Sequence, residues 1–412
     1  MKIKRSIFKW LLLLSLGVFC SPLYPQYKFF NPKESFAIEL SLPNTDLIRM
    51  PMYRNAITSL VVDSDYILGG TSAKEGLAPF LFTASLQNQK MIHLFDINEK
   101  IKGQRGIATG FKKGKDGNYY AGTIANKDKD GSKRSGHLIQ IKVDQQGNLS
   151  IKDLGSPIPG EGIFSLLSNA GGTLLYGITY PSGIFFKYNI ITKSVKEYRD
   201  LMPTNEDLKT LKSQAVLPDN YLGKALVEDN RGFIYGSLPI NKIFIFDAQN
   251  ESFEIMDSEI PEVWGRRALG QIESWAKAKN GTLYAGNAGD GQLFTLDPIT
   301  RKIKNLGKPI MMNRLKGLTF AKDGKLYGIA GGPPGYTHLF SYDDNDGYLD
   351  LGNPEFKMVA PGIEQGILWR GFRLGTIATS EDGKYVVMGE EEDLSQLLVF
   401  AVGNIGPDRI GF

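Results

Sequence analysis

Basic side chains recur at the points where short apolar segments of the chain begin. Arginine holds a carboxylate or sulfate with two parallel hydrogen bonds, and several cations that converge on one cleft attract a polyanion. The alternative is that these cations pair with acids such as Glu161, Glu262 or Glu273 and only tie neighbouring segments together. The basic residues are Arg54, Arg105, Lys224, Arg266, Arg267, Arg314, Lys316, Arg370 and Arg373.

Aromatic residues lie in the same stretches of the chain. Flat apolar rings with a polar edge stack well on the faces of sugars. Together with a cluster of basic residues at the cleft entrance, they would suit a glycan-binding site. We expect Trp275 to belong to the core, and Trp369 is open to both interpretations. The remaining candidates for ligand contact are Tyr53, Tyr180, Tyr221, Trp264 and Tyr336.

Tyr180 is the strongest single candidate for a catalytic residue. It lies just before Pro181 and Gly183, which shape a short turn. A phenol becomes a useful base when a neighbouring cation lowers its pKa, and Arg105 is a candidate for that cation. The alternative is a turn tyrosine that only packs.

The chain has three histidines, of which two lie at informative places. His137 and His338 each begin a predicted strand on the same side of the fold as Tyr180, and either is a candidate general base. A structural role is the alternative for both, and it is the expectation for His93. We therefore predict Tyr180, His137 and Arg105 as catalytic residues and His338 as a substrate contact.

No sequence pattern indicates a metal or an organic cofactor. A serine elbow, a phosphate loop and a dinucleotide fingerprint are all absent from the sequence. The acidic stretches 128–131 and 343–347 resemble calcium loops faintly, but neither completes the ligand pattern. We predict no metal and no cofactor, and we interpret both stretches as turns.

A repeated Tyr-x-Gly motif shows which elements position these side chains. It follows a Gly turn in most copies, and Asp-Gly and Asn-Gly supply the positive φ angles of a tight hairpin. Each copy follows a strand of small residues and precedes a strand rich in aromatic residues. The motif, with two weaker copies at the ends, occupies residues 66–69, 116–122, 172–177, 231–236, 280–286, 323–328 and 382–389.

Seven such units predict an all-β fold, a seven-bladed β-propeller of four-stranded antiparallel blades. The last unit lacks a fourth strand, so we expect residues 35–42 to pair into it and close the ring. The long insertions, above all 201–223 and 353–375, are fourth-to-first or second-to-third loops, which share one face. That face is the predicted binding surface, because function gathers on loops held by a rigid scaffold.

The N-terminal residues 1–20 have the basic and apolar segments of a signal peptide. We therefore expect a secreted or periplasmic protein with a single domain over residues 21–412. Cys20 is the sole cysteine and leaves a lipoprotein anchor open. The net charge of +4 does not suggest a nucleic-acid partner. No stretch of the mature chain is apolar enough to span a membrane. The sequence is compatible with a monomer.

The Tyr-x-Gly units, the segment 176–183 and the Leu-Phe-x-x-Asp stretch 293–297 resemble those of secreted bacterial seven-bladed propellers. Among enzymes, the chain is similar in style to the polysaccharide lyases that cleave ulvan and related uronate glycans. This resemblance covers nearly all of the mature chain. It implies a Tyr/His acid–base pair, here Tyr180 and His137, with an arginine that neutralises the uronate carboxylate before β-elimination.

Three functions remain open from the sequence. The first is a lyase acting on an acidic polysaccharide outside the cytoplasm. The second is a non-catalytic propeller that binds glycan or protein on the same face. The third is a lactone or sugar-ester hydrolase. Such propellers usually hold a metal on the axis through Glu, Asn and Asp side chains. We rank this function last because Glu161 is the only clear acid where an inner strand begins.

Overall fold

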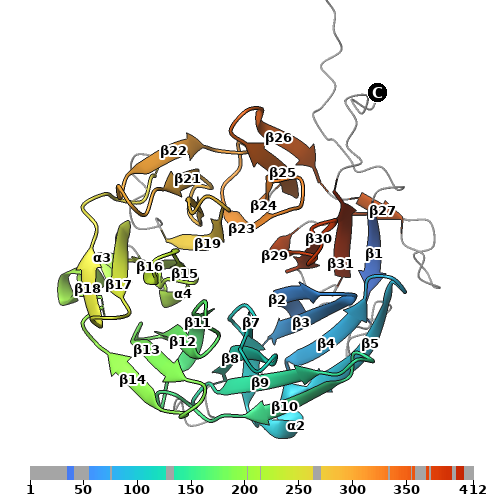
Figure 1. Ribbon diagram of the computed structural model, residues 1–412, viewed down its shortest axis with the longest axis horizontal. Coiled ribbons are helices and arrows are strands. Elements are labelled where there is room, and N and C mark those ends of the chain that lie inside the picture. The colour runs from blue at the N-terminus through green and yellow to red at the C-terminus, as the bar shows by residue number, and fades with distance from the viewer. Residues whose placement is uncertain are drawn as a thin grey trace, which may run out of the picture.

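Seven antiparallel blades form a ring around a central axis (Figure 1). The structure is a computed structural model and describes residues 35–40, 55–74, 77–126, 134–201, 203–213, 215–262, 271–332, 335–353, 355–357, 368–370, 373–391 and 396–402. The first strand of each blade lies next to the axis and the fourth lies on the rim. The predicted signal peptide and Cys20 fall outside the described residues.

The strands of the first four blades follow one another in chain order from the axis to the rim. Blade 1 comprises β2 (Asn55–Asp63), β3 (Tyr66–Ala73), β4 (Phe80–Ser85) and β5 (Lys90–Asp96). Blade 2 comprises β6 (Gln104–Ile107) with β7 (Lys112–Lys113), β8 (Tyr119–Ala125), β9 (Leu138–Val143) and β10 (Leu149–Asp153). Blade 3 comprises β11 (Gly162–Ser168), β12 (Leu174–Tyr180), β13 (Phe185–Asn189) and β14 (Val195–Tyr198). Blade 4 comprises β15 (Val227–Glu228), β16 (Phe233–Leu238), β17 (Lys242–Asp247) and β18 (Ser252–Ile255).

The remaining blades complete the ring. Blade 5 comprises β19 (Ile272–Lys277), β20 (Leu283–Asn287), β21 (Leu293–Leu296) and β22 (Ile303–Gly307). Blade 6 comprises β23 (Leu315–Phe320), β24 (Leu326–Gly331), β25 (Thr337–Asp343) and β26 (Gly347–Gly352). Blade 7 comprises β29 (Leu374–Thr379), β30 (Tyr385–Glu390), β31 (Gln396–Ala401) and β1 (Ser35–Glu39).

The N-terminal strand closes the ring as predicted. β1 pairs antiparallel with β31, and Phe36 lies opposite Val399. Ile38 is fully buried in a cluster that combines residues of blades 1 and 7, including Ile57 and Leu397. The prediction of an all-β propeller with seven four-stranded blades is therefore confirmed.

The Tyr-x-Gly motif has a packing reason at both of its fixed positions. A Cβ atom built on Gly236 would lie 2.6 Å from ring atoms of Phe244, because the aromatic side chain of the third strand covers the glycine. In blades 2, 4 and 6 the motif tyrosine is buried and its hydroxyl donates to the hairpin aspartate, as Tyr327 does to Asp323 at 2.9 Å. A larger residue at the glycine would collide with the aromatic ring, and Gly69, Gly177 and Gly328 lie under a phenylalanine in the same way.

Two insertions contain structure that the sequence analysis did not predict. Residues 201–223 form the helices α3 (Asn205–Ser213) and α4 (Pro218–Tyr221), and their buried Leu211 and Tyr221 pack against Phe164 of blade 3. Within the insertion at 353–375, β27 (Glu355–Lys357) pairs with β28 (Leu368–Arg370). A third, very short helix, α2 (Ile97–Lys100), links blades 1 and 2. Helices α3 and α4 matter for function because they cover the predicted binding face beside blade 3.

Candidate functional site

The inner strands of six blades each contain a β-bulge in their first half. A bulge leaves one residue without a partner in the ladder and re-aims its side chain. In blades 1, 2, 3, 5, 6 and 7, the unpaired residues are Thr58, Arg105, Phe164, Glu273, Lys316 and Gly375, and every one of them lines the central cavity. The repeated bulges therefore place a ring of residues around the axis.

Blade 4 supplies the corresponding position from the loop before its short inner strand. Lys224 precedes β15 and lines the same cavity. In blade 7 the bulge residue is glycine, since a Cβ atom on Gly375 would lie 2.9 Å from Cβ of Glu391. The side chain of Glu391, from the end of β30, takes the place that a bulge side chain fills in the other blades.

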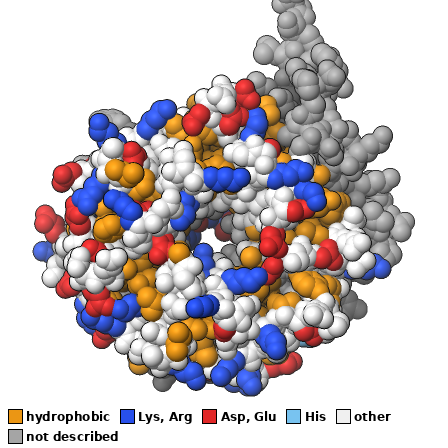
Figure 2. Space-filling view, in the orientation of Figure 1, with side chains coloured by type: hydrophobic (Ala, Val, Ile, Leu, Met, Phe, Trp, Pro, Cys, Tyr) orange, Lys and Arg blue, Asp and Glu red, His pale blue; other side chains and the backbone are white. Residues whose placement is uncertain are grey.

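The central cavity has a volume of about 490 Å³. Figure 2 shows the ring hollowed at its centre, with both basic and acidic side chains around the opening. The charged residues that line the cavity are four cations and three carboxylates: Arg105, Lys112, Lys224, Lys316, Asp219, Glu273 and Glu391.

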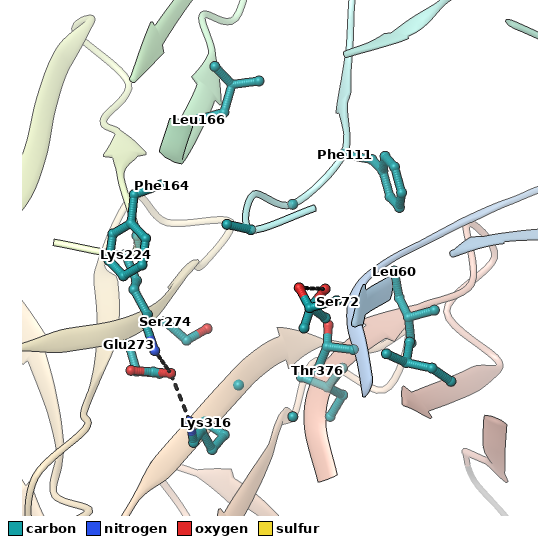
Figure 3. A pocket seen from close by; sticks show the side chains of 18 of the residues that line it. Leu60, Ser72, Phe111, Phe164, Leu166, Lys224, Glu273, Ser274, Lys316 and Thr376 are labelled. Carbon is teal, nitrogen blue, oxygen red and sulfur yellow. Dashed lines mark hydrogen bonds and ion pairs between the residues drawn. The ribbon is translucent and has the colours of Figure 1, made fainter. Parts of the chain in front are cut away.

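Most of these charges form one connected network. Oε1 of Glu273 lies 3.0 Å from Nζ of Lys224 and 3.1 Å from Nζ of Lys316 (Figure 3). Lys316 also lies 3.7 Å from Glu391, whose other oxygen accepts a 2.9 Å hydrogen bond from Nε of Arg373. Burial opposes the ionisation of Glu273, but the two ammonium groups outweigh it and lower the pKa of the carboxyl to about 2. The cations of blades 4 and 6 therefore tie their blades to blade 5, whereas Arg373 pairs within blade 7.

Arg105 differs from these cations. Its guanidinium makes no ion pair or hydrogen bond with any residue that the structure describes. It lines the central cavity and also a second cavity of about 460 Å³, which we call the side cavity. The side cavity is lined by Arg105, Ile124, Ala125, Asn126, Arg134, Gly160, Gly162, Tyr180, Pro181 and Pro218.

Tyr180 shares the side cavity with Arg105, as the sequence analysis expected of this pair. Its ring packs on Phe164 with centroids 5.5 Å apart, and Glu161 holds the following turn by accepting hydrogen bonds from the backbone N–H and hydroxyl of Ser182. Burial and then the negative charge of Asp219 raise the pKa of Tyr180, against the smaller opposite effect of Arg105. The raised pKa keeps the phenol protonated at neutral pH, whereas the sequence analysis expected a lowered pKa and a base.

The structure does not bring His137 together with Tyr180. Nδ1 of His137 lies 2.8 Å from Asp153 of the rim strand β10, and His137 is not among the described residues that line either cavity. His338 in blade 6 makes the matching contact with Asp350, at 3.0 Å, and is buried. His93, expected to be structural, accepts a hydrogen bond from the backbone N–H of Leu149 and ties blade 1 to blade 2.

The other predicted contacts are spread around the ring. Arg314 directly precedes β23 and Tyr336 directly precedes β25, and neither is among the residues found to line the two cavities. Trp369 and Arg370 lie in β28 of the insertion before blade 7. Trp275, expected in the core, packs against Phe294 but also lines the central cavity. Five predicted residues lie outside the described part of the chain: Tyr53, Arg54, Trp264, Arg266 and Arg267.

The lining residues that the sequence did not indicate include Lys112, Asn126, Arg134 and Asp219. Lys112 could not be anticipated because the inner strand of blade 2 is interrupted at residues 108–111 and resumes only at Lys112. Asp219 lies in the unpredicted helix α4, so no sequence signal placed it next to Tyr180. Arg134 lies in a second-to-third loop insertion, the class of loop that the analysis did assign to the binding face.

The described parts of the chain contain neither a cluster of metal ligands nor a membrane-spanning helix. No group of three His, Cys, Asp or Glu side chains there is arranged to hold a metal ion. No helix there is long and apolar enough to cross a membrane.

Comparison with known proteins identifies the fold and leaves the family open. No protein-family description matches the chain, and no curated protein matches it. Among solved structures, it is similar to a streptogramin B lyase, with a TM-score of 0.57 at 9% identity over 90% of this chain and 99% of the lyase. It is also similar to the RRP9 WD40 repeats, with a TM-score of 0.56 at 11% identity over 91% of this chain and 99% of the other.

A third similar structure is the extracellular domain of a one-component system from B. thetaiotaomicron. Its TM-score is 0.55 at 14% identity, over 89% of this chain and 40% of that protein. These neighbours include a lyase, a repeat domain and the extracellular domain of a one-component system, so the likeness concerns architecture alone. The chain is a β-propeller, and its function has to be argued from its own side chains.

Proposed function

We propose that this protein binds an acidic, uronate-containing glycan on the loop face of the propeller, with a carboxylate of the glycan held by Arg105. The observation that carries the proposal is that Arg105 lines both cavities and has no counter-ion among the described residues. A partly buried guanidinium without a carboxylate is an unsatisfied group with five donors, and a planar carboxylate satisfies two of them at once.

The surroundings of Arg105 suit a sugar acid. A second guanidinium, Arg134, and the amide of Asn126 line the same side cavity, and the rings of Tyr180 and Pro181 supply flat apolar surface. A volume of about 460 Å³ lies in the range of small-molecule sites, so one or two sugar rings of a longer chain would occupy it. The signal-peptide pattern of residues 1–20 supports an extracytoplasmic place of action.

A second candidate function, cleavage of the same glycan by β-elimination, is favoured by the contact between Tyr180 and Asp219. Arg105 would neutralise the uronate carboxylate and so acidify the proton on the neighbouring carbon. Asp219 would take that proton, the C–O bond of the leaving sugar would break, and protonated Tyr180 would donate to the leaving oxygen. His137 has no part in this scheme, because Asp153 holds it away from the side cavity.

The test uses immobilised uronate polysaccharides beside neutral and sulfated ones. The proposal expects retention of the wild-type protein on uronate chains and loss of retention as salt rises. Ultraviolet absorbance of unsaturated sugar ends, read in the same samples, distinguishes binding alone from elimination. Equal retention on neutral glycans, or none on any uronate chain, contradicts the binding proposal.

A further inference from the structure

Lys112 occupies a part of the central cavity that the proposed glycan site does not use. On β8, Gly106 of the first inner segment pairs with Ile124, whereas Lys112 of the second pairs with Tyr120. Four residues of an extended strand correspond to roughly 13 Å. Lys112 therefore lies well along the channel from Arg105, nearer the opposite face of the ring.

The interruption of the inner strand explains how a lysine reaches this place. Residues 108–111 leave the ladder between β6 and β7, and Oγ1 of Thr109 accepts a hydrogen bond from the backbone N–H of Gly122. The chain re-enters at Lys112, so the lysine lines the channel while its neighbour Lys113 turns outward and pairs with Asp63. Two consecutive lysines thus have opposite environments.

Lys112 has no hydrogen bond and no ion pair with the residues that the structure describes. Burial alone lowers the pKa of Lys112, which means that none of the three carboxylates in the channel compensates its charge. Glu273 and Glu391 are committed to Lys224, Lys316 and Arg373. Lys112 is half-buried, and withdrawing an ammonium group from water without a counter-ion is unfavourable.

The channel around Lys112 also offers apolar surface. Trp275 lines it from blade 5, three blades away, and Leu60, Phe111 and Ile377 line it as well. Nε1 of Trp275 is itself buried in the protein, so the indole N–H is not exposed to the channel. Lys112, whose ammonium group donates and cannot accept, is the donor that a ligand in this part of the channel would meet.

We propose that the central channel is a second ligand site, which binds a small organic carboxylate with an apolar body through Lys112. The carboxylate supplies the acceptor that Lys112 lacks, and the apolar body contacts the leucine, isoleucine and phenylalanine side chains of the channel. The proposal does not rest on glycan binding at Arg105, since the two groups lie at different depths of the ring.

The test is titration calorimetry of the full chain with hexanoate and benzoate, each compared with its uncharged amide. The proposal expects both carboxylates to bind and both amides to bind at least tenfold more weakly. Because burial lowers the pKa of Lys112, binding of an anion at alkaline pH should take up a proton, which two buffers of different ionisation heat reveal. Absence of binding by both carboxylates, or equal binding of acid and amide, overturns the proposal.

Variants locate the site. Lys112→Met should weaken carboxylate binding at least tenfold and abolish proton uptake, while Lys112→Arg should keep most of the affinity. Lys113→Met is the matched control and should bind like the wild type, since that lysine lies outside the channel. Carboxylate binding that survives Lys112→Met in a folded protein, as judged by its circular dichroism and thermal transition, contradicts the assignment.

Discussion

Blades 2 and 6 carry the same local arrangement and use it differently. Each has a cation at the bulge of its inner strand, Arg105 or Lys316, and each has a histidine that contacts an aspartate of the rim strand. Lys316 pairs with Glu273 of blade 5, while Arg105 has no counter-ion in the described structure. The neighbour therefore decides whether a repeated cation becomes a structural tie or a group available to a ligand.

The largest expected effect is a loss of stability on removal of the Glu273 carboxylate, which pairs with the lysines of blades 4 and 6. Glu273→Gln leaves the ammonium groups of Lys224 and Lys316 without their shared partner, and we expect the free energy of unfolding to fall by about 3 to 5 kcal/mol. Urea unfolding measures the loss. Glu197→Gln is the control, because its pair with Arg199 is exposed and should contribute less than about 1 kcal/mol.

The pH dependence of stability gives a second readout of the same variant. The pKa of Glu273 is lowered from 4.5 to about 2 in the folded protein, so its ionisation stabilises the fold above pH 4.5. This contribution is lost as the pH falls from there towards 2. Glu273→Gln should therefore flatten the acid side of the stability profile, and an unchanged slope would show that the network does not stabilise the fold.

The next largest expected effect is on glycan affinity and comes from Arg105, the cation of blade 2 without a counter-ion among the described residues. Arg105→Ala should weaken binding of a uronate oligosaccharide about tenfold to a hundredfold, the range for a charged hydrogen-bonding group, with little change in unfolding. Arg373→Ala is the matched variant, because that arginine pairs with Glu391 and should affect stability more than affinity. The reverse pattern, with Arg373 controlling affinity, would remove the distinction between the two blades.

Tyr180→Phe should have a smaller effect. Loss of the hydroxyl removes its contact with Asp219 and should cost about 1 kcal/mol of stability, with glycan affinity changed less than about threefold. Thermal unfolding and calorimetry measure the two quantities. A drop in affinity as large as that of Arg105→Ala would make the phenol part of the binding contact itself.

The histidine pair should give the smallest effects. His338→Ala, at a buried position, should cost about 1 kcal/mol, and His137→Ala, at a more exposed one, less. Neither should alter glycan affinity, since neither side chain lines the cavities. If His137→Ala alone abolished cleavage of a uronate chain, the acid–base role predicted from the sequence would be restored.

The ring could be predicted from sequence because its repeat has a strict packing reason. Gly236 lies under Phe244, and Tyr327 donates to the hairpin aspartate, so both features recur at readable spacing. The site was harder to predict. A bulge changes which side chain faces the axis without changing the composition of the strand. Arg105 and Lys224 could therefore be predicted to lie where inner strands begin, but the sequence did not show which of them has an ion-pair partner.

The site residues that could not be predicted reach the cavities through features of the tertiary structure. Lys112 follows an interruption of the inner strand that no local pattern marks, and Asp219 reaches Tyr180 from a helix inside an insertion. The catalytic role predicted for His137 stays a prediction. Its strand begins at residue 138, its side chain contacts Asp153 of the rim strand, and it is not among the described residues that line the two cavities.

The account rests most directly on the charge preference of Arg105. Calorimetry of the wild type and of Arg105→Ala, each with a uronate oligosaccharide and with its carboxyl-reduced neutral counterpart, tests that preference in one experiment. The account predicts that the wild type prefers the acidic sugar at least tenfold and that Arg105→Ala abolishes the preference while leaving the weak binding of the neutral sugar unchanged. Equal affinity of the wild type for both sugars, or a preference that survives the substitution, would contradict it.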